Sequence, residues 1–322
     1  MSKHIYIYSP SSAVRDKAAF KRGIKRLTAA GYNVEVDVTA LECDKRFAGS
    51  DETRVAAIHR AASSGADVAL ISRGGYGLTR ILSSIDYQMV ADSIGRGTQF
   101  VGFSDFTAFQ MALLARTGAM TWAGPALIDD FGTETGADEI MQACFDDLTT
   151  GQGEGSGWRL PKRPALKAGT NGLCMPCGPG EADGYMIEDS VLWGGNLAML
   201  ASLVGTPYLP NIEKGILFIE DVGEHPYRVE RMLAQLLQAG ILARQRAIIF
   251  GQFSGYTLGS HDKGYKLATV VDWLQKQVTA KVLTALPFGH VATKVLLPVG
   301  VPVTLAVEGR DAFLLWGHQH QH

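Results

Sequence analysis

The sequence has no apolar stretch long enough to span a bilayer and no long run of lysine or arginine. The first absence excludes a membrane-spanning helix. The second, with a formal net charge of -2, argues against nucleic acid or an anionic membrane as the main partner. The N-terminal residues MSKHIYIYSPSS lack the apolar core and cleavage site of a secretory signal, so we expect a cytoplasmic protein.

Cysteine is scarce as well, because the 322 residues include only Cys43, Cys144, Cys174 and Cys177. Four cysteines are too few for a disulfide-built scaffold of this length, which favours a reducing compartment. Cys174 and Cys177 form a single CxxC without a second ligand pair at the spacing of a zinc site. The pair also lies in a Gly/Pro-rich segment and not at a strand–helix junction, so we assign it no function.

Short β-rich runs alternate with helical patterns through the first half of the chain. This alternation predicts a parallel sheet with helices on both faces, a Rossmann- or flavodoxin-like α/β fold. Binding sites in such sheets form beyond the carboxyl ends of the strands. We expect strands over 4–10, 32–38, 66–72 and 98–104, a helix that ends at Gly31, one that ends at Gly65, and a helix over 105–117.

The composition changes after residue 150, where Gly, Pro and polar residues predominate up to about residue 183. We interpret residues 151–183 as a linker between an N-terminal α/β domain (1–150) and a C-terminal domain (184–322). The second domain mixes helical patterns with a β-rich end, so we expect a mixed α/β, β-rich architecture there.

Two motifs follow strands of the first domain. In VGFSDF, an apolar run stops at Ser104 and a helical pattern starts at once. Such a corner can present a nucleophile beside helix N–H groups, although a helix N-cap is the more common role of a serine there. The glycines of RGGYG, residues 73–77, can turn backbone N–H groups toward a ligand, or can simply form a tight turn.

Two further candidates lie in the second half of the chain. Glu220 ends an apolar strand and could orient a histidine, or could be the first solvated residue after the strand; Glu224 is its near competitor. His290 follows a Pro-Phe-Gly turn and is the histidine best placed to leave a core strand, although a structural role is more common. Asn196 follows two glycines at the start of a helical pattern, where a cap is the ordinary interpretation.

Five stretches together resemble one family: RGGYG, GFSDFTAF, WGGNLAMLASLVGTP, FIEDVGEHPYRVERML and FGHVATKVLLPVG. They are similar, in the same order and over nearly the whole chain, to the LD-carboxypeptidases of the S66 serine peptidase family. The resemblance is strongest to the members that trim murein tetrapeptides in the cytoplasm of Gram-negative bacteria. The main departure is the cysteine-containing segment KAGTNGLCMPCGPGEA.

The resemblance implies a Ser-His-Glu triad of Ser104, His290 and Glu220 in a cleft between the two domains, without a metal or cofactor. It implies an oxyanion hole formed by the backbone N–H of Asp105 and of Gly74 or Gly75. A terminal carboxylate of the substrate needs cationic or N–H donors. The candidates for substrate binding are Arg73, Tyr76, Asn196, Arg228 and Arg231, of which Arg231 could instead pair with Glu230 or Asp221.

The function that follows from the resemblance is release of the terminal D-alanine from a murein tetrapeptide through an acyl-enzyme, in cell-wall recycling. The implied partners are a murein peptide substrate and a second copy of the chain in a homodimer. Two alternatives stay open. One is a self-immunity peptidase of the same superfamily that cleaves a toxic peptide-nucleotide, and the other is a non-catalytic two-lobed module that closes on a ligand.

Overall fold

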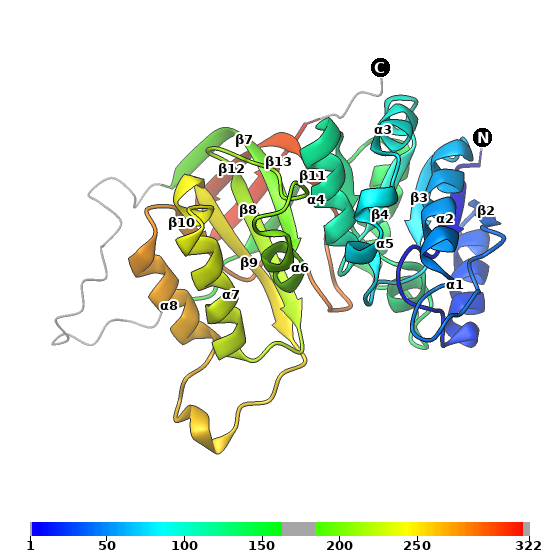
Figure 1. Ribbon diagram of the computed structural model, residues 1–322. Coiled ribbons are helices and arrows are strands. Elements are labelled where there is room, and N and C mark those ends of the chain that lie inside the picture. The colour runs from blue at the N-terminus through cyan, green and yellow to red at the C-terminus, as the bar shows by residue number, and fades with distance from the viewer. Residues whose placement is uncertain (1, 163–183, 318–322) are drawn as a thin grey trace, which may run out of the picture.

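The computed structural model describes residues 2–162 and 184–317, which form two β-sheets with their covering helices (Figure 1). The first sheet has six strands in the order β11-β5-β4-β3-β1-β2, all parallel except the antiparallel edge strand β11. Its strands are β1 (His4–Tyr8), β2 (Asn33–Val36), β3 (Val68–Ile71), β4 (Gln99–Gly102), β5 (Thr121–Ala123) and β11 (Leu297–Val299).

Helices cover both faces of the first sheet, and a separate apolar core lies on each side. Side chains of α1, η3 and α5 form one core with one face of the sheet, while α2, α3 and α4 pack on the other face. Their bounds are α1 (Lys17–Ala29), α2 (Asp51–Ser63), α3 (Tyr87–Gly95), α4 (Phe106–Thr117), the π-helical turn η3 (Leu127–Phe131) and α5 (Glu139–Thr150).

The second sheet has seven strands in the order β10-β9-β8-β7-β12-β13-β6. The four strands from β10 to β7 are parallel, and β12, β13 and β6 continue the sheet in antiparallel pairs. Helices α7 and α8 lie side by side over one face (Figure 1). The elements are β6 (Gly155–Arg159), β7 (Tyr185–Asn196), α6 (Leu197–Leu203), β8 (Ile216–Val222), α7 (Pro226–Gln238), β9 (Ala247–Ser254), α8 (Leu267–Gln277), β10 (Lys281–Leu283), β12 (Val301–Glu308) and β13 (Asp311–Leu315).

Helix α4 joins the two halves of the molecule. Nine consecutive residues, Phe106 to Leu114, are buried, so the helix has no solvent-facing stripe. A helix that is apolar all round belongs inside the protein, and α4 contacts α6 and β7 of the second half as well as its own sheet. The core that α2, α3 and α4 form with the first sheet is therefore continuous with the core of the second half, around the helix that begins beside Ser104.

The expected α/β architecture is confirmed, with a mainly parallel first sheet and a mixed second sheet. Two strands belong to a different part of the fold from the one that the expected domain boundaries assign to them. Strand β6 falls in the range interpreted as a linker, yet it pairs with β13 at the edge of the second sheet. Strand β11 falls in the range of the second domain, yet it pairs with β5 of the first sheet.

Residues 163–183 of the linker range, with Cys174 and Cys177, lie outside the described residues. Cys43 and Cys144 are free thiols. No helix within residues 2–162 and 184–317 has the length and apolar character that crossing a membrane requires.

Candidate active site

Ser104 occupies a strained turn between β4 and α4. Its φ angle is 65°, in the left-handed region that a residue with a side chain adopts at a cost of about 1–3 kcal/mol. Its side chain is only partly buried, whereas Phe103 and Asp105 on either side are buried. A strained strand-to-helix turn that exposes one hydroxyl at the carboxyl end of a parallel sheet is the geometry of a nucleophile elbow.

Ser104 does not act as the N-cap of α4, which was the alternative interpretation. The residue at the N-cap of α4 is Asp105, and the helix start has no side-chain cap hydrogen bond. The Ser104 carbonyl accepts the Thr107 N–H at 3.0 Å, so Ser104 contacts the first turn of the helix through its backbone and not through its hydroxyl. The hydroxyl is therefore available for chemistry.

The RGGYG loop packs directly against Ser104. A Cβ atom built on Gly74 would lie 2.7 Å from the Ser104 Cβ and 2.8 Å from its Oγ, so only glycine permits this approach. Gly75 has a φ angle of 114°, which also requires glycine. Within the described residues, the backbone N–H groups of Gly74, Gly75 and Asp105 have no hydrogen-bond acceptor. Three unused donors thus lie around the Ser104 turn.

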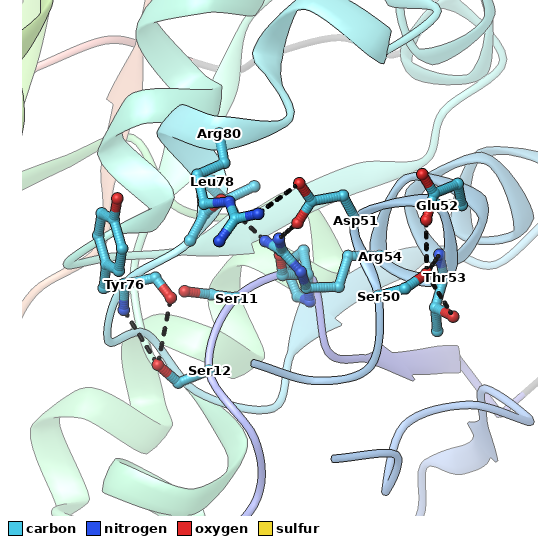
Figure 2. Close-up of polar contacts among 12 residues, drawn as sticks. Ser11, Ser12, Ser50, Asp51, Glu52, Thr53, Arg54, Tyr76, Leu78 and Arg80 are labelled. Carbon is cyan, nitrogen blue, oxygen red and sulfur yellow. Dashed lines mark hydrogen bonds and ion pairs between the residues drawn. The ribbon is translucent and has the colours of Figure 1, made fainter. Parts of the chain in front are cut away.

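A buried arginine holds the far end of this loop. Arg54 of α2 has no exposed surface, donates to the Gly77 carbonyl at 2.8 Å and forms an ion pair with Asp51. Figure 2 shows Asp51 between Arg54 and Arg80, and Arg80 reaches its second oxygen at 3.0 Å. An unpaired buried guanidinium would be very costly, so these contacts fix the path of the loop end.

Two serines of the β1 loop and the side chain of Asp105 complete the support. Ser12 Oγ accepts the Tyr76 N–H at 3.0 Å, which the close-up also shows (Figure 2). The buried Asp105 carboxylate accepts the Ser11 hydroxyl and, at 3.0 Å, the Leu78 N–H. Burial raises the pKa of Asp105, and these hydrogen bonds oppose that effect. Asp105 therefore links the nucleophile turn to the glycine loop.

Glu220 and His290 meet beside this turn. Glu220 lies on β8 and is fully buried, so it is not the solvated strand end that was the alternative interpretation. Its Oε2 is 2.8 Å from His290 Nδ1, and the histidine side chain is 21% exposed. A proton on Nδ1 then leaves Nε2 as the free basic nitrogen.

The second oxygen of Glu220 is held by Asn196. The Asn196 amide donates to Glu220 Oε1 at 3.2 Å and to Asp221 Oδ1 at 3.0 Å. The predicted cap is also present, because Asn196 Oδ1 accepts the Met199 N–H of α6. The Asn196 N–H in turn donates to Thr107 Oγ1 of α4 at 3.0 Å. Asn196 thus connects the carboxylate to the helix that starts beside the nucleophile turn.

Phe103 connects Ser104 and His290. Its ring centroid lies 4.9 Å from that of the imidazole, and the next residue is Ser104. Among the residues that the structure describes, the Ser104 hydroxyl and the imidazole do not form a hydrogen bond. Such bonds are often long without substrate and shorten when it binds. The structure therefore brings the carboxylate and the imidazole together, and the imidazole contacts the residue that precedes Ser104.

The candidates for substrate binding are dispersed. Arg73 lies at the start of the glycine loop, with a buried Nε that has no partner within the described chain, and Tyr76 is 40% exposed. Arg228 is engaged by Glu224 one helical turn earlier, and Arg231 is exposed on α7. The partners considered for Arg231 have other contacts, because Glu230 accepts the Tyr265 hydroxyl and Asp221 is held by Asn196.

Asp221 has an unusual environment for a carboxylate. Burial first, and then the neighbouring Glu220, raise the pKa of Asp221 from 3.8 to about 6. The folded protein therefore holds this proton between pH 4 and 6 while the unfolded chain has released it. Stability from this group is present below about pH 4 and is lost as the pH rises through about 6.

An Asp221→Asn variant is expected to lack this pH dependence. A pKa change from 3.8 to about 6 corresponds to about 3 kcal/mol, so the difference in unfolding free energy between variant and wild type should change by about that amount from pH 3 to pH 7. Urea unfolding followed by circular dichroism at several pH values measures it, with the exposed Asp272→Asn as control. A difference in unfolding free energy that stays constant with pH would contradict a raised pKa of Asp221.

A Gly74→Ala variant should lose activity without losing its fold. The added methyl would occupy the space 2.8 Å from Ser104 Oγ and displace the hydroxyl or the loop. If Gly74 presents the oxyanion donor that the resemblance implies for Gly74 or Gly75, its displacement costs about 2.7–4 kcal/mol of barrier, and we expect kcat to fall by about 100- to 1,000-fold. Gly95→Ala, at the end of α3 with no positive φ and nothing within 4 Å of the added methyl, is the control for a glycine substitution. Equal kcat values for the two variants would contradict the close approach.

Several residues of this site carried no sequence signal. Arg54 and Thr107 lie within ordinary helical patterns, and Ser11 and Ser12 within a polar turn, so nothing in their spacing indicates a role. The exception is Asp105, whose place directly after Ser104 in a strand-to-helix turn suggested its backbone donor, though not its side-chain contacts.

Comparison with known proteins agrees with the five sequence stretches. Residues 5–124 match the LD-carboxypeptidase N-terminal domain, and residues 189–305 match the LD-carboxypeptidase C-terminal domain. The crystal structure of muramoyltetrapeptide carboxypeptidase from Oxalobacter formigenes superposes with a TM-score of 0.83 at 36% identity, covering 98% of this chain and 99% of that one.

Two curated relatives are similar over most of their length. A protein from Streptomyces coelicolor named as a carboxypeptidase is 31% identical over 80% of this chain and 75% of its own. The microcin C7 self-immunity protein of Escherichia coli is 26% identical over 94% of this chain and 90% of its own.

Proposed function

The chain belongs to the LD-carboxypeptidase family, so it is a peptidase, and we propose that it removes the terminal D-alanine from murein tetrapeptides by serine catalysis. The observation that carries the proposal is the buried Glu220 carboxylate bound to His290 Nδ1 beside the strained Ser104 turn. A buried carboxylate that is hydrogen-bonded to an imidazole has little structural reason to lie beside a strained serine turn that follows a strand of the other sheet.

In the proposed reaction His290 Nε2 takes the Ser104 proton as Oγ attacks the carbonyl of the bond to D-alanine. Glu220 stabilises the imidazolium that forms and keeps the ring oriented through Nδ1. The imidazolium then protonates the amine of D-alanine, which leaves. Water, activated by the same imidazole, hydrolyses the acyl-Ser104 ester and restores the hydroxyl.

The oxyanion of each tetrahedral intermediate needs donors that are already in place. The N–H groups of Asp105 and of Gly74 or Gly75 have no acceptor within the described chain, and the carboxylate of Asp105 and Arg54 hold the segments that present them. Donors fixed before the reaction stabilise developing charge without reorganisation. This arrangement supports the assignment of these backbone groups to the oxyanion hole.

The test is incubation of the purified protein with the free tetrapeptide L-Ala-γ-D-Glu-meso-DAP-D-Ala, with D-alanine detected by mass. A parallel incubation with a peptide-nucleotide addresses the alternative suggested by similarity to the self-immunity protein. Rapid release of D-alanine with slow or no cleavage of the nucleotide supports the proposal. The reverse selectivity supports the self-immunity alternative, and binding without cleavage of either compound supports a ligand-binding module.

A role in cell-wall recycling inside the cytoplasm is part of the same proposal. It requires activity on free peptides released from murein. Comparing turnover of the free tetrapeptide with that of the same peptide attached to its sugars measures this preference. Activity confined to intact polymeric murein would contradict the recycling role.

A further inference from the structure

The loop that carries His290 spans the two halves of the protein. It leaves β10 of the second sheet and enters β11, which pairs with β5 of the first sheet. Its first part is fastened to β9, because the Gln252 N–H donates to the Phe288 carbonyl at 2.8 Å and the Ser254 hydroxyl donates to the His290 carbonyl at 3.2 Å. Its second part is attached to the half that carries Ser104, through β11 and through the side chains of Thr293 and Lys294.

The most buried of the side-chain attachments is an ion pair with almost no exposure to solvent. Lys294 Nζ lies 2.7 Å from Asp130 Oδ1, and the side chains are 2% and 1% exposed. The other oxygen of Asp130 accepts the Ala126 N–H at 2.8 Å, so the carboxylate is fixed on the η3 turn of the first half. Burial raises the pKa of Asp130, and the charge of Lys294 opposes this effect.

The ammonium group also contacts the ring of Phe103, the residue before Ser104. Lys294 Nζ lies 3.9 Å from the centroid of Phe103, a distance typical of a cation–π contact. The same ring contacts the His290 imidazole, with centroids 4.9 Å apart, and Phe103 directly precedes Ser104 in the chain. Ammonium, phenyl ring and imidazole therefore form one contiguous set of contacts.

We infer that Lys294 is a positioning residue: its ion pair with Asp130 holds the His290 loop against the Phe103–Ser104 turn and so sets the distance between base and nucleophile. The inference rests on the proposed function, because it concerns the same Ser104 and His290. Lys294 does not reach the reacting atoms in this role and acts through Phe103 and the loop.

The chemistry of the pair argues for positioning over simple stability. Taking two charges out of water costs several kcal/mol per ion, and well-packed apolar residues often stabilise a core equally well. An ion pair differs from an apolar contact in that it fixes direction and distance. The same loop makes a second, less buried contact with the first half, in which the Thr293 hydroxyl donates to Asp138 at 2.6 Å.

The experiment compares Lys294→Met with the double variant Lys294→Met/Asp130→Asn. The single variant leaves a carboxylate buried without its cation, so it is destabilised, whereas the double variant removes both charges and regains stability. The control is Arg60→Met, which breaks the ion pair to the fully buried Asp37 away from the His290 loop. Thermal unfolding is recorded for all proteins.

Two readouts follow the proposed base and nucleophile. One is tetrapeptide turnover, and the other is the rate at which a fluorophosphonate probe labels Ser104, which needs the base but not the substrate. Both Lys294 variants should lose about 100-fold in kcat and in labelling rate, the cost of a displacement of about 1 Å, with KM changed by less than about threefold. Arg60→Met should retain both rates at a temperature where it is folded.

The outcomes separate the inference from the function on which it rests. A double variant that is stable, yet labels and turns over slowly, supports a positioning role. A double variant that regains stability and the wild-type rates overturns the inference and leaves the peptidase intact. A wild-type protein that neither labels nor releases D-alanine overturns the proposed function, and the inference falls with it.

Discussion

A Ser104→Ala variant is expected to lose tetrapeptide hydrolysis by about 10⁵-fold and to keep its affinity for the tetrapeptide. The change removes only the attacking oxygen. Alanine and serine adopt the left-handed φ of 65° at similar cost, so the turn should keep its shape. Without the hydroxyl no acyl-enzyme forms, and the base and oxyanion donors can accelerate only a direct attack by water.

Mass detection of D-alanine gives the rate of this variant, and isothermal titration calorimetry gives its affinity. Ser63→Ala is the control, because that hydroxyl is exposed at the end of α2 and only donates to the His59 carbonyl. A Ser104→Ala protein within about tenfold of the wild-type kcat would remove Ser104 from the reaction. If neither protein releases D-alanine and both bind the tetrapeptide with the same affinity, a non-catalytic module is favoured instead.

The sequence allows the elements around Ser104 to be predicted because their signals are local. Strand β4 is a short apolar run, and the helix after it begins within one residue of its predicted start. Helix α1 likewise ends just before Gly31, whose φ of 94° few residues with a side chain adopt. The spacing of the apolar residues and the position of a glycine therefore define these elements, without knowledge of what packs against them in the fold.

The partners of strands β6 and β11 could not be predicted in this way. Each strand is short, and its place in a sheet depends on pairing with residues more than a hundred positions away. The pairing of β11 with β5 joins the His290 loop to the first sheet, so the boundary between the two halves does not follow the order of the chain. Spacing along the sequence contains no information about such pairing.

For the site, the sequence indicated the types of residue but not the buried charges that hold them. Ser104, Glu220 and His290 each had a more common structural interpretation, and only the ordered resemblance to one family brought them together. Arg54 and Lys294 are fully buried, although lysine and arginine are among the residues least often found inside. Nothing local marks such an exception, since it depends on a carboxylate supplied from elsewhere in the fold.

A Glu220→Gln variant should fold normally and lose about 10⁴-fold in kcat. Each oxygen of Glu220 has its own donor, because Oε2 receives His290 Nδ1 and Oε1 receives the Asn196 amide. Glutamine has one oxygen, so one of these donors must face an N–H group. If that donor is the imidazole, its proton moves to Nε2, the nitrogen that should accept the Ser104 proton.

Comparison with Glu224→Gln makes the Glu220 prediction specific. Glu224 is the nearby competing carboxylate, but it is paired with Arg228, whereas Glu220 contacts the imidazole. We therefore expect the large fall in kcat only for Glu220→Gln, with thermal unfolding to establish that both variants are folded. A fall in Glu224→Gln alone would transfer the acidic role to that residue. Wild-type rates in both variants would mean that the imidazole needs no carboxylate, which would contradict a triad in which the fully buried Glu220 supports His290.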